Sequence, residues 1–212
     1  MNKPVQVLTA LGIMVCCICS CGGKEKTVLP DTNDADKTIA LKIENGTGLT
    51  YKISPAEGVN YSLDLTFREL SPKLSFDFVM TNMDYTKGSV EMAEAARKAS
   101  HILTSELQNG KSILTDRTSM VLSLESYRDL LEAGKTRLMW GAEEQEFVVV
   151  NNEDYKFEKG NGNVTETVIH CANPTKTKHL WVWKNPELPL IMKTQGNPSM
   201  ELTYWYLPGE RP

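Results

Sequence analysis

Cysteine is nearly absent from most of the chain. The 212 residues include five cysteines, of which four lie within residues 16–21 and the fifth is Cys171. Residues 22–212 therefore carry one thiol and cannot form an intramolecular disulfide, so a domain there must be stabilised by burial of apolar surface. A lone thiol is either a nucleophile or a small buried hydrophobe, and we expect Cys171 to be the latter.

Histidine is also scarce, since the chain has only His101, His170 and His179. His170 and Cys171 are neighbours in an expected strand, so their side chains point to opposite faces and cannot share a metal ion. His101 lies in an expected helix with no His or carboxylate three or four residues further on. The sequence therefore predicts no metal site and no cofactor.

The common sequence signatures of hydrolases are missing: there is no GxSxG, SxxK or HExxH motif. Ser119 and Ser123 flank an expected strand–helix junction, but no glycine is present there to permit a strained nucleophile turn. Ser123 is therefore predicted to be a helix N-cap. We expect a protein that is not an enzyme, with a hydrolase that uses Cys171 or Ser123 as an alternative.

Positive charge is not in excess. The chain has 23 Lys and Arg against 27 Asp and Glu, for a net charge of −4. This balance argues against nucleic acid as a partner and against electrostatic docking on anionic lipid headgroups. Membrane attachment would then have to come from an apolar group.

No apolar run is long enough to span a bilayer, which takes about 20 residues. The longest, residues 5–18, follows Lys3 and ends in Ile18-Cys19-Ser20-Cys21. This ending resembles the lipobox of type II signal peptides in bacterial lipoproteins. The resemblance implies a diacylglyceryl thioether on Cys21, cleavage of the Ser20–Cys21 bond and acylation of the new amine, so that acyl chains hold the protein on a membrane. The alternative is an ordinary secretory leader that is rich in cysteine.

Three segments are expected. Residues 1–20 form the lipoprotein signal peptide, residues 21–38 the acylated Cys and a flexible polar tether, and residues 39–212 a single globular β-rich domain. Many lipoproteins of gut-type Gram-negative bacteria carry an acidic run directly after the acylated Cys, which sends them to the cell surface. Residues 22–26 (GGKEK) lack such a run, which favours the periplasmic leaflet of the outer membrane over the cell surface.

Alternating apolar and polar residues dominate the domain. The alternation over 60–70 and 73–82 predicts a hairpin with one buried face. Residues 41–44 and 49–53 flank Asn45-Gly46-Thr47-Gly48, which predicts another hairpin. Further strands are expected at 136–140, 146–150, 155–158, 164–171, 180–183, 190–194 and 200–207, with a hairpin turn at Gly160-Asn161-Gly162.

Two stretches change to helical periodicity. Residues 91–107 repeat apolar side chains near 3.6-residue spacing, and a shorter helix is expected between Ser123 and Gly134. Each has one apolar side, so both should pack on a sheet. The expected fold class is α+β, mainly antiparallel β: a curled sheet or half-barrel with two helices packed on one face.

Aromatic residues gather near the C-terminus, where three of the four tryptophans lie. They form the core, line an apolar cleft on a concave face, or make an exposed platform for sugars or a partner protein. We treat them as a candidate ligand or partner face. They are Trp181, Trp183, Tyr204, Trp205 and Tyr206.

The order of elements, ending in a strand, Pro186-Glu187-Leu188-Pro189-Leu190 and another strand, resembles the half-barrel of periplasmic lipoprotein carriers. Residues 114–138 are similar to a segment of uncharacterised lipoproteins from gut-type bacteria. The second resemblance implies no activity. From the aromatic C-terminal strands and the lack of a catalytic constellation, we expect a non-enzymatic, lipid-anchored cell-envelope module that holds an apolar ligand in a concave aromatic-lined face. The alternative is a structural or accessory subunit of an outer-membrane assembly, with an envelope protein as its partner.

Overall fold

A computed structural model describes residues 41–81, 86–160 and 162–210. By its contacts the chain separates into two units, Met1–Ile39 and Ala40–Pro212. All described strands, both described helices and the hydrophobic core lie in the second unit.

The predicted signal peptide (1–20) and the tether with Cys21 (21–38) lie outside the described residues. Within the described part of the chain, no helix is both long and apolar enough to cross a membrane.

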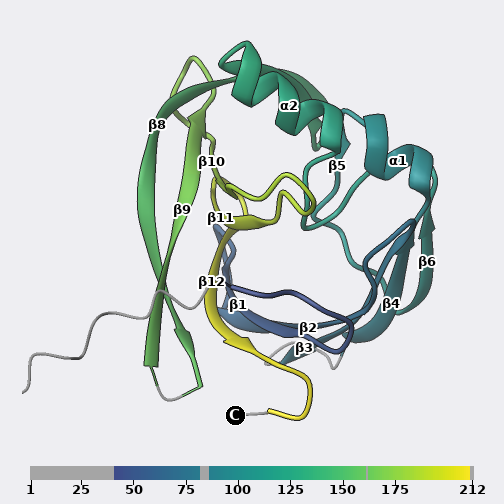
Figure 1. Cartoon of the computed structure of the whole chain (residues 1–212). Coiled ribbons are helices and arrows are strands. Elements are labelled where there is room, and N and C mark those ends of the chain that lie inside the picture. Colours follow the sequence, from purple (N-terminus) through teal and green to yellow (C-terminus); the bar gives the residue numbers. More distant parts are fainter. Residues whose placement is uncertain (1–40, 82–85, 161, 211–212) are drawn as a thin grey trace, which may run out of the picture. The chain divides into compact units, whose positions relative to one another are not determined.

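The fold is built on one twelve-stranded sheet in the order β5-β7-β8-β9-β10-β11-β12-β1-β2-β3-β4-β6. Figure 1 shows the strands following a curve from β8 and β9, through β12, β1 and β2, to β4 and β6, with α1 and α2 across its open side. The strands are β1 (Gly48–Ser54), β2 (Tyr61–Glu69), β3 (Leu74–Thr81), β4 (Thr86–Met92), β5 (Ile102–Leu103), β6 (Gly110–Leu114), β7 (Lys135–Trp140), β8 (Glu143–Lys159), β9 (Gly162–Ala172), β10 (His179–Trp183), β11 (Ile191–Gln195) and β12 (Ser199–Tyr206), and the helices are α1 (Glu94–Ala99) and α2 (Leu124–Glu132).

The predicted fold class is confirmed: the sheet is curled and mostly antiparallel, and the two helices contribute little of the chain. The expected hairpin is β2–β3, which pairs Leu63 with Met80 and Leu65 with Phe78. These four side chains are buried, as the alternation required, because residues two apart on a strand share one face.

The second predicted helix is also confirmed as α2. The Ser123 hydroxyl accepts a hydrogen bond from the backbone N–H of Ser126 (3.1 Å) and so caps the helix. Tyr127 and Leu130 are buried. Gly134 follows the helix with φ of +69°, a left-handed conformation that glycine adopts without strain.

The helix predicted over 91–107 was wrong in extent, because only the six residues of α1 are helical. Met92 belongs to β4 and Leu103 to β5, so the apolar spacing came from three separate elements. The helix stops where Ser100 is extended (φ −70°, ψ 135°). The Ser100 hydroxyl donates to the carbonyl oxygen of Asp116 (2.6 Å), which fixes the chain in this non-helical course.

The strand predicted at 41–44 was wrong. The backbone N–H of Glu44 donates to the Thr47 hydroxyl (3.0 Å) and the N–H of Thr47 donates back to the Glu44 carbonyl (2.9 Å). This pair of hydrogen bonds makes a turn in which Gly46 has φ of +90°. The chain then enters β1, whose partners are β2 and β12 rather than the preceding residues.

The strands predicted at 146–150 and 155–158 are one strand, β8, which pairs with β7 from Glu143 to Val148 and with β9 from Val148 to Lys159. The pairing with β9 has a register shift between Val149 and Asn151. The polar residues between the two runs are largely exposed, which is why they resembled a loop. The hairpin turn predicted after β8 is confirmed, since Lys159 pairs with Gly162. Strands β4, β5 and β6 were not predicted.

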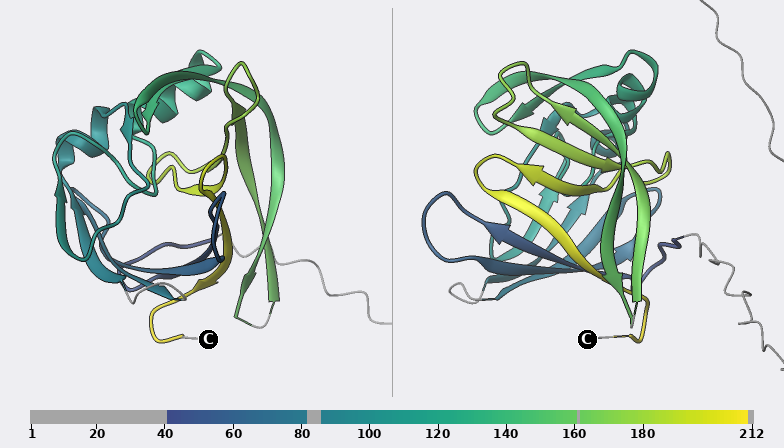
Figure 2. Two further views of the ribbon diagram at one scale, coloured as in Figure 1. Left: turned by 180° about the vertical axis from the view of Figure 1, so that it is seen from behind. Right: turned by 90° about the vertical axis from the view of Figure 1, so that its left-hand side faces the viewer.

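Three pairs of strands are parallel, so the sheet is not a simple meander: β4 with β6, β5 with β7, and β8 with β12. The last pair places Tyr204 opposite Glu158 and Trp205 opposite Lys159. It closes a ring made of β8, β9, β10, β11 and β12. The right-hand view of Figure 2 shows the long β8–β9 hairpin (green) in the foreground, next to β12 (yellow).

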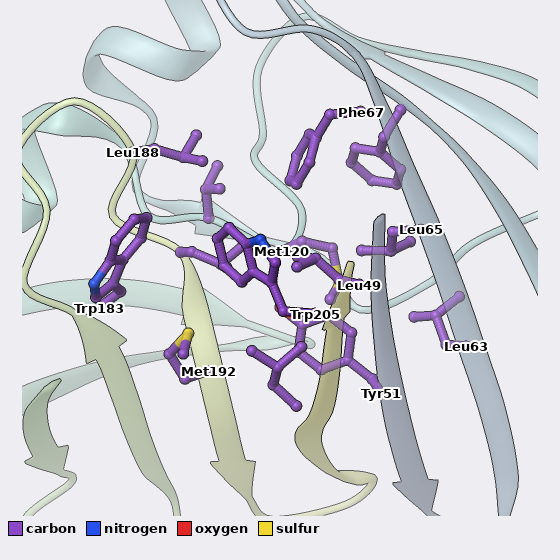
Figure 3. Close-up of a cluster of buried hydrophobic side chains, with 14 of the residues drawn as sticks. Leu49, Tyr51, Leu63, Leu65, Phe67, Met120, Trp183, Leu188, Met192 and Trp205 are labelled. Atoms are coloured by element: carbon purple, nitrogen blue, oxygen red, sulfur yellow. The ribbon is translucent and has the colours of Figure 1, made fainter. Parts of the chain in front are cut away.

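The core has two clusters. The larger covers one face of β1–β4 and includes Trp183 and Trp205, with Leu188 from the Pro-containing segment between β10 and β11 (Figure 3). The smaller lies under α2 and includes Tyr127 and Phe147. Residues 188–190 are buried, and their backbone is held as well, because the N–H of Leu122 donates to the Pro189 carbonyl (3.0 Å).

Candidate functional site

The C-terminal aromatic residues are largely inside the protein. Trp205 is fully buried and Trp183 is 4 % exposed. Their rings meet edge to face with centroids 5.7 Å apart, and Phe157 packs on Trp205 at 6.0 Å. Of the three alternatives that the sequence left open, the structure places Trp183 and Trp205 in the core.

Tyr204 and Tyr206 are also tied to the framework. Their rings lie 6.3 Å apart. The Tyr204 hydroxyl donates to the Gly160 carbonyl (3.1 Å), linking β12 to the turn after β8. The Tyr206 ring covers Gly48, where a Cβ atom would lie 1.7 Å from a ring carbon. Gly48 is therefore required for the close approach of β12 to β1.

Trp181 is 8 % exposed and belongs to the larger core cluster as well, but it also contacts polar side chains. Its indole stacks on the imidazole of His170 with centroids 4.4 Å apart and an interplanar angle of 5°. Its ring N–H donates to the Glu153 carboxylate. The Lys193 ammonium lies 5.4 Å from the ring centroid, within reach of a cation–π interaction.

The three histidines have distinct surroundings. His101 is not on a helix as predicted, but follows α1 with its Nδ1 3.1 Å from the Arg137 carbonyl. His170 and His179 lie side by side, with His170 Nε2 2.9 Å from His179 Nδ1. Burial lowers the pKa of His170, partly opposed by the Glu153 carboxylate.

The pairing of these two histidines was not predicted from the sequence. Strands β9 and β10 pair in a register that sets Trp181 opposite His170, so His179, two residues earlier, lies diagonally across on the same face. The pattern His-x-Trp in one strand and His in the preceding strand was the available signal. It carries information only once the register of the two strands is known.

The serines named as candidate nucleophiles are buried. Ser123 is 1 % exposed and Ser119 is fully buried. The Ser123 hydroxyl makes two hydrogen bonds, both with Ser126. It donates to the Ser126 hydroxyl (3.0 Å) and accepts from the Ser126 backbone N–H. Their hydroxyls have no open approach for a substrate in this structure.

Cys171 should not react with thiol reagents while the chain is folded. It is fully buried in the smaller core cluster, and burial raises the pKa of its thiol to about 12. Because the thiolate is the nucleophile, we expect alkylation at pH 8 to be slower than in unfolded chain by at least about a thousandfold. Mass spectrometry of the Cys171 peptide after iodoacetamide treatment, with and without urea, measures this rate. Equal labelling in both conditions would contradict it.

An apolar pocket lies where the two core clusters meet. Its walls come from β1, β2, β3, β5, β7, β11 and β12 and from the irregular segment after β5. Leu63 from the larger cluster and Trp140 from the smaller both line it, together with Tyr61, Leu107 and Met200. None of the five C-terminal aromatic residues does.

The chemistry of this pocket is that of an apolar binding site. No lining residue is charged, and the side-chain polar groups are the hydroxyls of Tyr61, Thr104, Ser105 and Thr194. Its volume is about 40 Å³, whereas sites for drug-sized ligands measure about 300–1,000 Å³. As it stands, the pocket has room for the end of a narrow apolar chain.

One wall of the pocket is built from residues 104–107, which have no regular secondary structure. Thr104 is held by its N–H to the Thr118 carbonyl (2.9 Å), and Glu106 by its N–H to the Thr104 hydroxyl (3.2 Å). Leu107 is half-buried against the larger core cluster. A wall of this kind moves outward more readily than a paired strand.

No family model matches the chain, and neither curated proteins nor solved structures include a significant match.

Proposed function

We propose that this chain is a lipid-anchored cell-envelope module that binds an apolar ligand, without catalysing a reaction. The observation that carries the proposal is the apolar pocket, whose walls are free of charged residues and join the two core clusters. Charged and nucleophilic groups are what most catalytic sites are built from, and a site of this composition is suited to retention of a ligand.

The ligand class follows from the shape and lining of the pocket. Burial of an apolar chain contributes about 0.8 kcal/mol for each CH₂ group removed from water. A branched or bulky ligand needs more room than about 40 Å³, so a linear acyl chain that enters end first fits best. Outward movement of residues 104–107 would lengthen the space available to it.

The attachment half of the proposal depends on Ile18-Cys19-Ser20-Cys21, the segment that resembles a lipobox. Two or more acyl chains anchor a protein stably where one does not. Outer-membrane attachment on the periplasmic leaflet would hold the folded unit close to acyl-chain ligands.

Filling the pocket should abolish ligand uptake. In Leu107→Trp the larger ring enters the pocket from its irregular wall, so we expect binding of a fluorescent polyunsaturated fatty acid to weaken at least tenfold. A titration followed by probe fluorescence measures the affinity. Val59→Trp is the matched control, because Val59 is 76 % exposed and does not line the pocket.

Thermal unfolding of both variants is measured first. A midpoint equal to that of the parent chain shows that any difference in binding comes from the pocket and not from a loss of folding. The proposal fails if the parent chain binds no probe. It also fails if Leu107→Trp and Val59→Trp bind the probe equally well.

A further inference from the structure

His170 of β9 and His179 of β10 form a histidine pair on the indole of Trp181. Their facing nitrogens, His170 Nε2 and His179 Nδ1, are 2.9 Å apart. Both imidazoles are stacked on Trp181, at angles of 5° and 20° to its plane. None of the three residues lines the apolar pocket, so the pair is separate from the site proposed above.

The hydrogen bond at the far side of His179 fixes its tautomer. Its Nε2 lies 3.0 Å from the backbone carbonyl oxygen of Lys176. A carbonyl oxygen only accepts hydrogen bonds, so Nε2 must carry a hydrogen. In the neutral imidazole, Nδ1 then presents a lone pair toward His170.

The side-chain amide of Asn151 fixes the tautomer of His170 in the same way. The Asn151 Nδ2 group donates to the Glu153 carboxylate (3.4 Å), which turns the Asn151 Oδ1 atom toward His170 Nδ1 at 3.2 Å. The same carboxylate lies 3.8 Å from Nδ1. Since all the oxygens near Nδ1 are acceptors, Nδ1 carries the hydrogen and Nε2 presents a lone pair toward His179.

Two lone pairs at 2.9 Å repel each other unless a cation lies between or beside them. We propose that His170 and His179 together bind one divalent transition-metal ion, and bind Cu²⁺ more tightly than Zn²⁺. Two nitrogens at about 2.05 Å from a metal and 90° apart are separated by about 2.9 Å, so the pair already has the spacing of adjacent ligands. Imidazole suits copper and zinc, and copper stands highest in the affinity series.

The surroundings of the pair match those of metal-bound histidines. Such histidines usually donate their second ring N–H to a carboxylate, a backbone carbonyl or a water molecule, all of which are oxygen acceptors. Here Lys176 and Asn151 supply those acceptors. The Glu153 carboxylate contributes negative charge next to the pair, while the Lys193 ammonium is paired with Glu201 (3.1 Å).

The metal ion would have two protein ligands. Within residues 41–81, 86–160 and 162–210, no group of three or more His, Cys, Asp or Glu side chains is arranged to hold a metal. Water or an exogenous ligand must fill the other positions. An open coordination sphere of this kind binds and releases its ion more easily than a closed structural site.

Copper titration of the full chain tests the proposal. The protein is prepared without a histidine tag, and its accessible thiols are first blocked with iodoacetamide so that the cysteines at 16–21 do not compete. We expect one equivalent of Cu²⁺ to quench tryptophan fluorescence, because Trp181 stacks on the pair. The electron paramagnetic resonance spectrum should show coupling to nitrogen.

His170→Ala and His179→Ala should each weaken Cu²⁺ binding at least tenfold. His101→Ala is the matched control, since His101 is exposed and its ring contacts Arg137 and Ser126 instead of the pair. Removing the orienting group in Asn151→Ala should weaken binding by about tenfold, as the loss of other groups that orient metal-bound histidines does. If His179→Ala fails to fold, His179→Gln retains a donor for the Lys176 carbonyl and removes the metal-binding nitrogen.

The proposal is overturned if His170→Ala, His179→Ala and His101→Ala bind Cu²⁺ as the parent chain does. It is equally overturned if the parent chain binds no Cu²⁺ with nitrogen coupling, in which case a shared proton satisfies the two lone pairs. Neither result affects fatty-acid binding in the apolar pocket, so the two proposals succeed or fail separately.

Discussion

Trp205→Ala should lower the free energy of unfolding by about 3–5 kcal/mol, the usual cost of truncating a fully buried aromatic residue. Trp205 is completely buried, and its ring packs against Trp183 and Phe157 from two other strands. It lies on β12, which pairs with β1, β8 and β11. A cavity at this position removes contacts from several strands at once, and urea denaturation followed by circular dichroism measures the loss.

Trp205→Phe is the matched control. The smaller ring retains part of the packing, and it removes an indole N–H that is buried and makes no hydrogen bond with any described residue. Removing an unsatisfied buried donor is favourable, so we expect less than half of the loss caused by alanine. Equal losses for the two variants would contradict the packing argument.

Cys21→Ala should abolish lipid attachment completely. The lipobox resemblance makes the Cys21 sulfur the acceptor of the diacylglyceryl group, so without it the acyl chains cannot be added. We expect no incorporation of radiolabelled palmitate, a precursor that stays uncut between Ser20 and Cys21, and no firm association with membranes through acyl chains. These are read from a labelled gel and from membrane fractionation.

Cys19→Ala controls for the loss of a nearby thiol. Cys19 lies before the predicted cleavage point and should be removed with the leader, so this variant should be labelled like the parent chain. Palmitate retained in Cys21→Ala would contradict the lipobox assignment.

Local patterns predicted the local structure well. The alternation over β2 and β3 depends only on which residues share a strand face, and both strands have one buried face. The short helix α2 was equally accessible, because its cap at Ser123 and its stop at Gly134 are signals within a dozen residues.

Elements whose position depends on distant contacts could not be predicted. The 91–107 spacing looked helical although Met92 pairs with Leu74 in β3 and Leu103 with Trp140 in β7. The parallel pairing of β8 with β12 joins strands about 45 residues apart in the chain and leaves no periodicity of its own.

The candidate sites also combine features that the sequence shows locally with features that depend on distant contacts. Composition pointed to the C-terminal aromatic residues, but burial in a core and exposure on a surface have the same sequence pattern. The histidine pair depends on the register between β9 and β10, and the apolar pocket on seven strands that meet in space. Both therefore required the folded arrangement.

The place of the last strand determines when the chain can fold. Strand β12 lies between β11 and β1, so β1–β4 and β8–β11 are not joined in the sheet until residues 199–206 are available. During synthesis from the N-terminus, these two groups of strands remain unjoined until β12 has emerged. The twelve-stranded sheet thus depends on β12 for its continuity, because only this strand pairs with both β11 and β1 among the described residues.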